Sequence, residues 1–358
     1  MTRKVTLMKK FLALADGSVF EGVGFGAEKD SVGELVFTTG VCGYIETLTD
    51  PSYYGQIVMQ TFPQVGNYGI IDEDFEGEPA LFGYVVREYC EAPSNFRCGG
   101  TLDAFLRERG IPGVCGVDTR EITRRIRESG TMNAAIVSEV PSDLGFITDY
   151  SVKGAVAAVS RRDALTLPAF GGEKYKVALL DFGAKGHIAE NLRERGCAVT
   201  ELPFDTSAEV ILSGGFDGLM LSNGPGDPAE NAGVVAELKK LLGKLPIFGI
   251  CLGHQLLALA AGGRTVKLPY GHRGANQPVR DLENGRVYIT SQNHGYAADG
   301  DVPGAKPLFV NANDGTNEGL VYPDLKALSA QFHPEANAGP HDAGFLFDRF
   351  IQLLEDNK

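Results

Sequence analysis

Residues 245–261 read "LPIFGICLGHQLLALAA", and this stretch decides the fold of the second half of the chain. A short apolar run leads into it, and an apolar run of helical length leads out. Between them stands Cys251, with a glycine two residues away on either side. This G-x-C-x-G pattern predicts a strand that turns sharply into a helix with the cysteine at the apex, because side chains at the glycine positions would collide.

Strand and helix patterns alternate throughout the second half. Apolar runs predict strands at 176–183, 198–204, 216–221 and 245–250, and helical patterns fall at 188–196 and 231–244. Alternation of this kind predicts a doubly wound, mostly parallel sheet with helices on both faces. Functional sites in such sheets form where the carboxyl ends of the strands meet the loops.

The first half reads as strands joined by turns, with few helices. Asp16 and Gly17 between two short apolar runs predict a hairpin. Thr101 is the expected N-cap of one helix, and Asp118 or Thr119 that of another. The fold class is therefore α/β, with a mixed, β-rich first domain.

Proline, a Gly-Gly pair and mixed charge interrupt the pattern between the two halves. We therefore expect an N-terminal domain over residues 1–160, a linker over 161–175 and a C-terminal domain over 176–358.

Composition and charge argue against several classes of function. The 358 residues carry a net charge of −13, which argues against nucleic acid as a partner. No run approaches the ~18 apolar residues of a membrane span. The six cysteines form no C-x-x-C pair, and H-E-x-x-H is absent, so no metal site is expected. We expect a cytoplasmic protein without a membrane partner.

The expected bend would make Cys251 a nucleophile. A helix N-terminus stabilises a thiolate, and the backbone N–H of Leu252 would point at a developing oxyanion. His333 in "LSAQFHPEA" is the expected base, and Glu335, two residues on, would orient its ring. A lone buried cysteine or histidine is usually structural, but the combination favours a Cys-His-Glu triad.

A glycine-rich loop supports this interpretation. "LSNGPGDP" (221–228) follows a predicted strand, and its few side chains leave backbone N–H groups open to a substrate. We expect a second oxyanion donor here. An ordinary strand-to-helix turn would explain the loop if it stood alone.

These motifs together resemble the class I, triad-type glutamine amidotransferases. In that family the cysteine attacks the side-chain amide of glutamine, ammonia leaves, and water hydrolyses the thioester. The first half resembles the N-terminal domain of the small subunits of carbamoyl-phosphate synthase. The matching stretches are "GELVFTTGVCGYIETLTDPSYYGQIV" (33–58), "IPGVCGVDTREITRRIRESG" (111–130), "GHRGANQPV" (271–279), "TSQNHGYA" (290–297) and "HPEANAGPHDAGFLFDRFI" (333–351).

The resemblance implies a set of glutamine contacts, namely Gly40, Gly224, Gly226, Leu252, Gln255, Asn293, Gly295 and Tyr296. Gly40 stands where the family often has serine, so a side-chain contact is lost there. Tyr296 replaces the more usual phenylalanine, which keeps a backbone contact and a ring surface.

The resemblance also implies a partner. No P-loop motif occurs in the chain, so no cofactor is expected here. By resemblance a large subunit uses ATP and Mg²⁺, receives the ammonia through an internal passage, and makes carbamoyl phosphate for arginine and pyrimidine synthesis. The N-terminal domain would be the docking platform in this heterodimer.

Three alternatives remain open from the sequence. The chain could serve another synthase, which would not pair with the carbamoyl-phosphate synthase large subunit. It could be a cysteine hydrolase acting on peptides or polyglutamates without a partner. It could be a non-catalytic binding module, in which case replacing Cys251 would change nothing.

Overall fold

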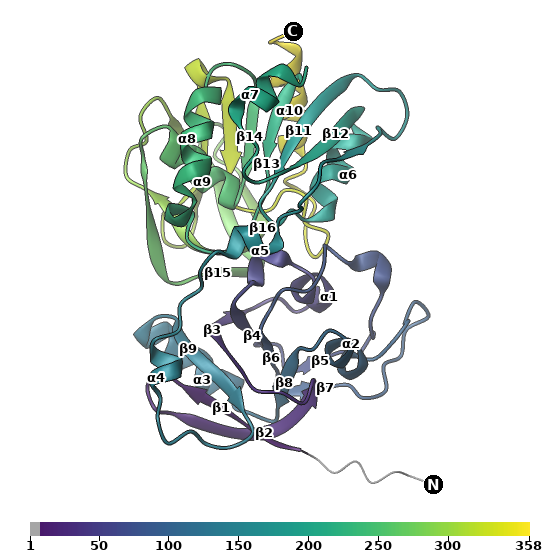
Figure 1. Ribbon diagram of the computed structural model, residues 1–358, viewed down its shortest axis with the longest axis vertical. Coiled ribbons are helices and arrows are strands. Elements are labelled where there is room, and N and C mark those ends of the chain that lie inside the picture. The colour runs from purple at the N-terminus through teal and green to yellow at the C-terminus, as the bar shows by residue number, and fades with distance from the viewer. Residues whose placement is uncertain (1–7) are drawn as a thin grey trace. The chain divides into compact units, whose positions relative to one another are not determined.

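The computed structural model describes residues 8–358 (Figure 1). The chain divides into two compact units between Val152 and Lys153. The division comes before residues 161–175, where the sequence suggested a linker. That segment contains a short strand that pairs with the sheet of the second unit, so its proline and glycines lie within that unit.

The first unit is built on a closed barrel of strands. Within residues 8–152 the barrel order is β1 (Lys9–Leu14), β2 (Val19–Gly26), β8 (Pro112–Cys115), β6 (Gly83–Val85), β4 (Gln56–Gln60), β3 (Ser31–Thr38) and β9 (Met132–Val137). β1 and β2 form the predicted antiparallel hairpin. β3, β4, β6 and β8 run parallel to one another, so their carboxyl ends lie at one rim of the barrel. A separate parallel pair is β5 (Gln64–Val65) and β7 (Glu88–Tyr89).

The helices of this unit are α1 (Tyr44–Leu48), α2 (Leu102–Glu108), α3 (Thr119–Ser129) and α4 (Gly145–Thr148). Of these, α2 and α3 begin where the sequence indicates, whereas α1 and α4 were not predicted. The Thr101 side chain caps α2 by accepting a hydrogen bond from the Ala104 N–H, at 3.3 Å. Asp118, the first of the two candidates, caps α3 by accepting from the Glu121 N–H at 3.0 Å.

The second unit contains one ten-stranded sheet. Its order is β10 (Leu165–Leu167), β12 (Cys197–Pro203), β11 (Tyr175–Asp181), β13 (Gly218–Leu221), β14 (Ile247–Ile250), β19 (Ala327–Ala330), β18 (Asn317–Tyr322), β17 (Lys306–Asn311), β15 (Arg264–Asp281) and β16 (Val287–Asp299). The five strands from β12 to β19 are parallel, which confirms the expected doubly wound core. β15 to β18 extend this core with antiparallel pairs.

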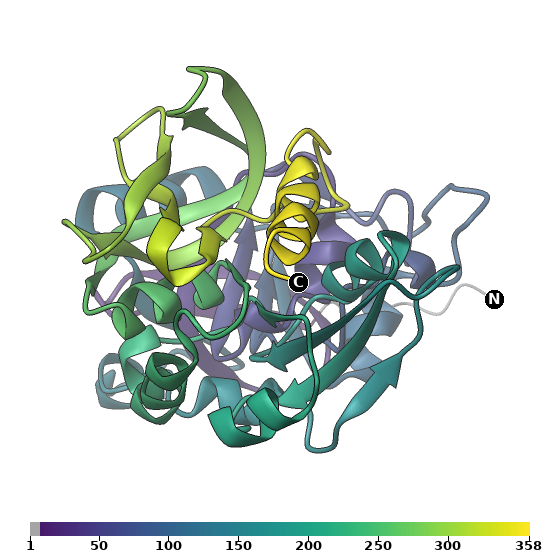
Figure 2. The same cartoon turned by 90° about the horizontal axis from the view of Figure 1, so that it is seen from above.

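Helices cover both faces of this sheet (Figures 1 and 2). They are α5 (Ala155–Val159), α6 (Gly186–Glu194), α7 (Ala208–Ser213), α8 (Ala232–Leu241), α9 (Leu252–Ala260) and α10 (Phe345–Glu355). Side chains of β11 alternate between two cores: Ala178 and Leu180 pack with α7, α8 and α9, whereas Val177 and Leu179 pack with α6 and α10. None of the helices within residues 8–358 combines the length and hydropathy that crossing a bilayer requires.

Candidate active site

Cys251 lies at the junction of β14 and α9, where the sequence places a sharp bend. Its backbone adopts φ 53° and ψ −103°, a conformation that non-glycine residues rarely adopt, and the residue is 2% exposed. Strain of this kind persists where the surrounding structure enforces it, and it is typical of functional sites.

The two flanking glycines are required by close backbone contacts. A Cβ atom at Gly249 would lie 2.7 Å from the carbonyl carbon of Gly253, and a Cβ at Gly253 would lie 2.4 Å from the Leu221 carbonyl oxygen. Both distances are shorter than real contacts permit. The collision expected from the G-x-C-x-G spacing is therefore confirmed.

Neighbouring strands fix the nucleophile in place. The Cys251 N–H donates to the Ala330 carbonyl of β19 at 2.8 Å, and the Gly253 N–H donates to the Ser222 carbonyl at 3.0 Å. Leu252 is the first residue of α9, so its N–H has no acceptor within the helix. This N–H is therefore suited to bind an oxyanion.

His333 and Glu335 form the pair expected from the sequence. His333 Nδ1 lies 2.7 Å from Glu335 Oε1, and both residues are buried. β19 ends at Ala330, before the histidine, but the His333 N–H donates to the Ser291 carbonyl at 3.0 Å and holds this segment against β16. The short extension beyond the strand therefore positions the ring.

The groups around His333 shift its pKa in opposite directions. Burial and the charge of Lys185 lower its pKa, but the Glu335 carboxylate and the Cys251 sulfur outweigh them and raise it above its ordinary value. Burial alone would raise the pKa of Glu335, but the charge of His333 and their shared hydrogen bond hold it below its usual range. The pair therefore favours an imidazolium next to a carboxylate.

The second ring nitrogen of His333 is available for chemistry. Nε2 makes no hydrogen bond within residues 8–358, although the sulfur of Cys251 is near enough to raise the pKa of the ring. The resting thiol donates instead to the Asn293 carbonyl, with 3.6 Å between Sγ and the oxygen. Turning the thiol from the Asn293 carbonyl towards Nε2 would let a proton pass between sulfur and imidazole.

Lys185 is a member of the site that the sequence reasoning missed. It is 7% exposed, and its charge acts on both His333 and Glu335. Its backbone N–H donates to Asn223 Oδ1 at 3.0 Å, which ties it to the glycine-rich loop. Its position shortly after β11 was the available signal, since sites gather at the carboxyl ends of parallel strands.

Several predicted glutamine contacts gather next to the thiol. Gln255, one turn into α9, donates from Nε2 to the Tyr296 carbonyl at 2.7 Å and to Gln331 Oε1 at 2.9 Å. Asn293 accepts from the thiol through its carbonyl. The structure therefore joins Asn293 to Cys251 and Gln255 to Tyr296.

The predicted glycine contacts lie in different surroundings. A Cβ at Gly224 would approach Leu252 Cδ2 to 2.9 Å, so the loop lies directly against the start of α9. Gly295 follows Asn293 on β16 and adjoins Arg273. Gly40 belongs to the first unit, where its carbonyl accepts from Gln60 Nε2 at 2.7 Å. The expected contact of Gly40 with glutamine stays a prediction.

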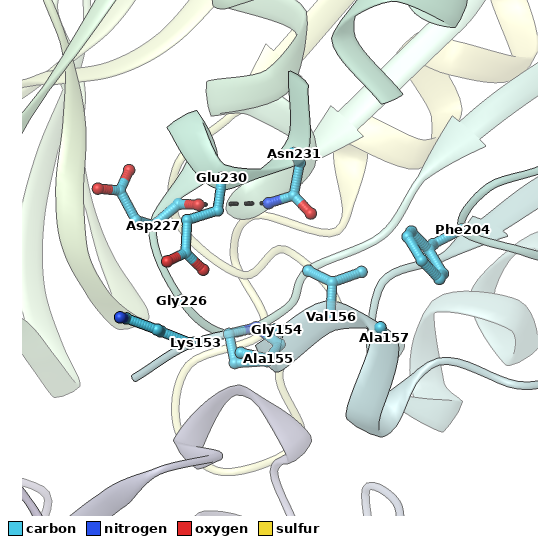
Figure 3. A pocket seen from close by; sticks show the side chains of 11 residues that line it. Lys153, Gly154, Ala155, Val156, Ala157, Phe204, Gly226, Asp227, Glu230 and Asn231 are labelled. Carbon is cyan, nitrogen blue, oxygen red and sulfur yellow. Dashed lines mark hydrogen bonds between the residues drawn. The ribbon is translucent and has the colours of Figure 1, made fainter. Parts of the chain in front are cut away.

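The glycine-rich loop also borders a pocket of about 420 Å³ (Figure 3). Gly226, which has φ +88°, packs against α5 there, and its added Cβ would lie 3.1 Å from the Ala155 Cβ. Asp227 and Glu230 line one side, and Asn231 donates to the Asp227 carbonyl at 3.3 Å. Cys251, His333 and Glu335 do not line this pocket, so it is separate from the thiol.

His254 is excluded as an alternative base by its surroundings. It is fully buried, and burial lowers its pKa to about 3, so the ring is neutral. Its Nδ1 lies 2.8 Å from Ser329 Oγ. The buried His294 bonds through Nδ1 to the Tyr296 carbonyl at 2.8 Å, which places it beside a predicted glutamine contact.

Within residues 8–358 one group could hold a metal ion, namely His272, His294 and Glu318, all buried. Both ring nitrogens of His272 already face carboxylates, Glu318 at 3.2 Å and Asp314 at 2.9 Å. These ion pairs account for the group without a metal, since a ligating imidazole needs one free lone pair.

Family models match both halves of the chain. The model described as "Carbamoyl-phosphate synthase small chain, CPSase domain" matches residues 12–136, and "Glutamine amidotransferase class-I" matches residues 178–353. The first match falls in the barrel unit, and the second contains Cys251, His333 and Glu335.

Curated relatives match almost the whole chain. A carbamoyl phosphate synthase small chain of Listeria monocytogenes is 47% identical, with 97% of each chain covered. That of Clostridium perfringens is 49% identical, with 96% of this chain and 99% of the relative covered. That of Bacillus cereus is 48% identical over 98% of this chain and 97% of the relative.

Proposed function

Because the chain belongs to the family of carbamoyl-phosphate synthase small chains, we propose that Cys251, His333 and Glu335 are the residues with which it hydrolyses glutamine. Its role is that of the glutaminase subunit of carbamoyl-phosphate synthase. The single observation that carries the residue assignment is the buried Nδ1–Oε1 contact of 2.7 Å, which leaves the other nitrogen of His333 beside the nucleophile.

In the first half-reaction, the Cys251 thiolate adds to the side-chain carbonyl carbon of glutamine. The carbonyl π electrons move to oxygen, where the Leu252 N–H stabilises the negative charge. Collapse of this intermediate breaks the carbon–nitrogen bond, and the His333 imidazolium gives its proton to the leaving nitrogen. Ammonia departs, and a glutamyl thioester remains.

In the second half-reaction, His333 is neutral and accepts a proton from water as the water oxygen attacks the thioester carbon. A second oxyanion forms at the same place. Its collapse expels the Cys251 thiolate and releases glutamate. Glu335 keeps Nδ1 protonated and stabilises the imidazolium, as expected for the third member of a triad.

The glycine-rich loop supplies the second oxyanion donor in this proposal. Gly224 lies against the Leu252 side chain, which brings the loop to the start of α9, and we expect one of its backbone N–H groups to face the same oxyanion as the Leu252 N–H. Asn293 contacts the thiol, and Gln255, one turn into α9, is bonded to Tyr296; these three residues would hold the α-amino and α-carboxylate groups of glutamine. Gly226, Gly295 and Gly40 are further proposed contacts.

The ammonia is consumed by a partner in this proposal. We expect the large chain of carbamoyl-phosphate synthase to bind this chain, to use ATP and Mg²⁺, and to combine the ammonia with bicarbonate. Transfer within the complex would keep ammonia from protonation in bulk water.

The test compares two nitrogen sources. Cys251→Ser should abolish glutamine-dependent carbamoyl phosphate synthesis by the reconstituted complex and leave ammonia-dependent synthesis unchanged. Cys197→Ser is a matched control, because Cys197 is a buried thiol on β12 that is not part of the triad. Equal loss of both activities in Cys251→Ser would contradict the proposal, as would retention of the glutamine-dependent activity.

A further inference from the structure

A cavity of about 870 Å³ opens in the first unit, at the rim where the parallel strands of the barrel end. Thr61 and Pro63 follow β4, Arg87 follows β6, and Asp118 lies between β8 and α3. Carboxyl ends of parallel strands are the usual place for ligand sites in α/β folds. The volume lies within the range of pockets for small molecules.

Arginines dominate the lining of this cavity. Arg87 is joined by three arginines of α3, namely Arg120, Arg124 and Arg127, while Asp118 and Glu128 are the lining carboxylates. This local excess of positive charge contrasts with the net charge of −13 for the whole chain. The rim of the barrel is therefore a place where an anion is attracted to an otherwise acidic protein.

Two of these arginines have no carboxylate partner within residues 8–358. Arg87 donates from Nη1 to the Val117 carbonyl at 3.2 Å, which fixes its guanidinium without neutralising it. Arg120 is exposed and has no ion pair. Arg124, in contrast, is paired with Glu121 at 2.9 Å and with Glu128 at 3.2 Å. The available positive charge therefore belongs to Arg87 and Arg120.

We propose that this cavity binds a small phosphorylated ligand, with Arg87 and Arg120 contacting its phosphate. Guanidinium groups bind phosphate through paired, charge-assisted hydrogen bonds. Thr61 and Thr123 offer hydroxyl oxygens in the same cavity. The proposal does not depend on the glutamine site, because the cavity is formed entirely by residues of the first unit.

The charge distribution favours a small anion over an acidic segment of a partner protein. A small ligand inside the cavity lies within about 8 Å of the arginines, the distance over which charges act at physiological salt. An acidic protein would extend beyond the cavity, onto a chain whose net charge of −13 has the same sign. The lining, built from segments that follow the strands and from one face of α3, also suits a small ligand.

Titration calorimetry of the full chain with adenosine 5′-monophosphate, pyrophosphate and adenosine tests the proposal. The two phosphorylated probes should bind, and adenosine should not. Arg120→Gln should weaken binding at least tenfold, and Arg87→Gln should do the same. Arg125→Gln is the matched control on α3: Arg125 pairs with Glu121 and Ser18 outside the cavity, so binding should be unchanged.

A second variant should move affinity in the opposite direction. Glu128→Gln removes a lining carboxylate and frees Arg124 from one ion pair, so the phosphorylated probes should bind more tightly. Since Arg120 is exposed and unpaired, its variant should fold normally, which thermal unfolding would verify.

Three outcomes overturn the proposal. The phosphorylated probes do not bind at millimolar concentration, or Arg125→Gln weakens binding as much as Arg120→Gln, or Arg120→Gln weakens only association with the large chain. The last result would assign the cavity to protein docking. Cys251→Ser should bind the probes as the unmodified chain does, so failure of the glutaminase proposal would leave this result unaffected.

Discussion

The carboxylate of Glu335 lies 2.7 Å from Nδ1 of His333, and the two side chains are buried together two residues apart in sequence. A charge placed this close in a buried site acts strongly on its neighbour. Glu335 therefore determines how readily His333 holds a proton, and the site's dependence on pH should follow this contact.

Removing the charge of Glu335 should lower the pKa of His333. The carboxylate is one of the groups that raise it, so Glu335→Gln should shift the alkaline limb of glutaminase activity to lower pH, because His333 loses its proton earlier. Activity at the optimum should fall less than in His333→Asn, for which a loss of about 10²–10⁴-fold is expected. Rate profiles against pH measure both effects, with exposed Glu230→Gln as control. An unchanged alkaline limb would contradict the inference that the Glu335 charge raises the pKa of His333.

Removing the charge of Lys185 should have the opposite effect. Lys185 lowers the pKa of His333, so Lys185→Met should raise it and move the alkaline limb to higher pH. Lys176→Met, an exposed lysine on β11, is the control and should leave the profile unchanged. If both lysine variants shift the limb equally, the effect is a general one of net charge and does not arise at the site.

The bend at Cys251 should not tolerate a methyl group at Gly253. The added Cβ would meet the Leu221 carbonyl at 2.4 Å, so Gly253→Ala should destabilise the protein by about 1–3 kcal/mol and displace the nucleophile. Thermal unfolding and glutaminase assays measure the two effects. Gly233→Ala on α8 is the control, because nothing lies within 4 Å of its added Cβ. Full activity in Gly253→Ala would show that the backbone there can relax.

Ser329 should matter for stability through His254. The Nδ1 nitrogen of this buried, neutral ring lies 2.8 Å from Ser329 Oγ, and its Nε2 has no partner within residues 8–358. Ser329→Ala would leave the ring without a hydrogen bond, at an expected cost of about 1–3 kcal/mol in unfolding free energy. Chemical denaturation checks this, with exposed Ser213→Ala as control. Equal stability of the two variants would contradict the assignment.

Features fixed by local geometry could be predicted from the sequence. The bend at Cys251 and the cap at Thr101 depend on residues within one turn of each other, so short patterns sufficed, whereas the cap of α3 was left open between Asp118 and Thr119. The contact of His333 with Glu335 followed from a spacing of two residues in extended chain.

Features fixed by contacts between distant segments were missed. Lys185 and His333 lie far apart in sequence, and only the sheet places one charge beside the other. The strands β15 to β18 were also missed. Parts of this antiparallel extension are exposed and carry many polar residues, so the apolar pattern that indicates a strand is weak there. β10 could not be predicted because it has only three residues and pairs on one side alone, so its sequence carries little pattern.

The closure of the barrel gives the two units different exposure to unwanted strand pairing. β1 pairs with β9 as well as with β2, so every strand of the described barrel has a paired neighbour on each side. The ten-stranded sheet does end in edges, at β10 and β16. Aggregation or domain swapping by strand addition would therefore begin at the second unit, and at the longer edge, β16, where Val287 and Ile289 are exposed.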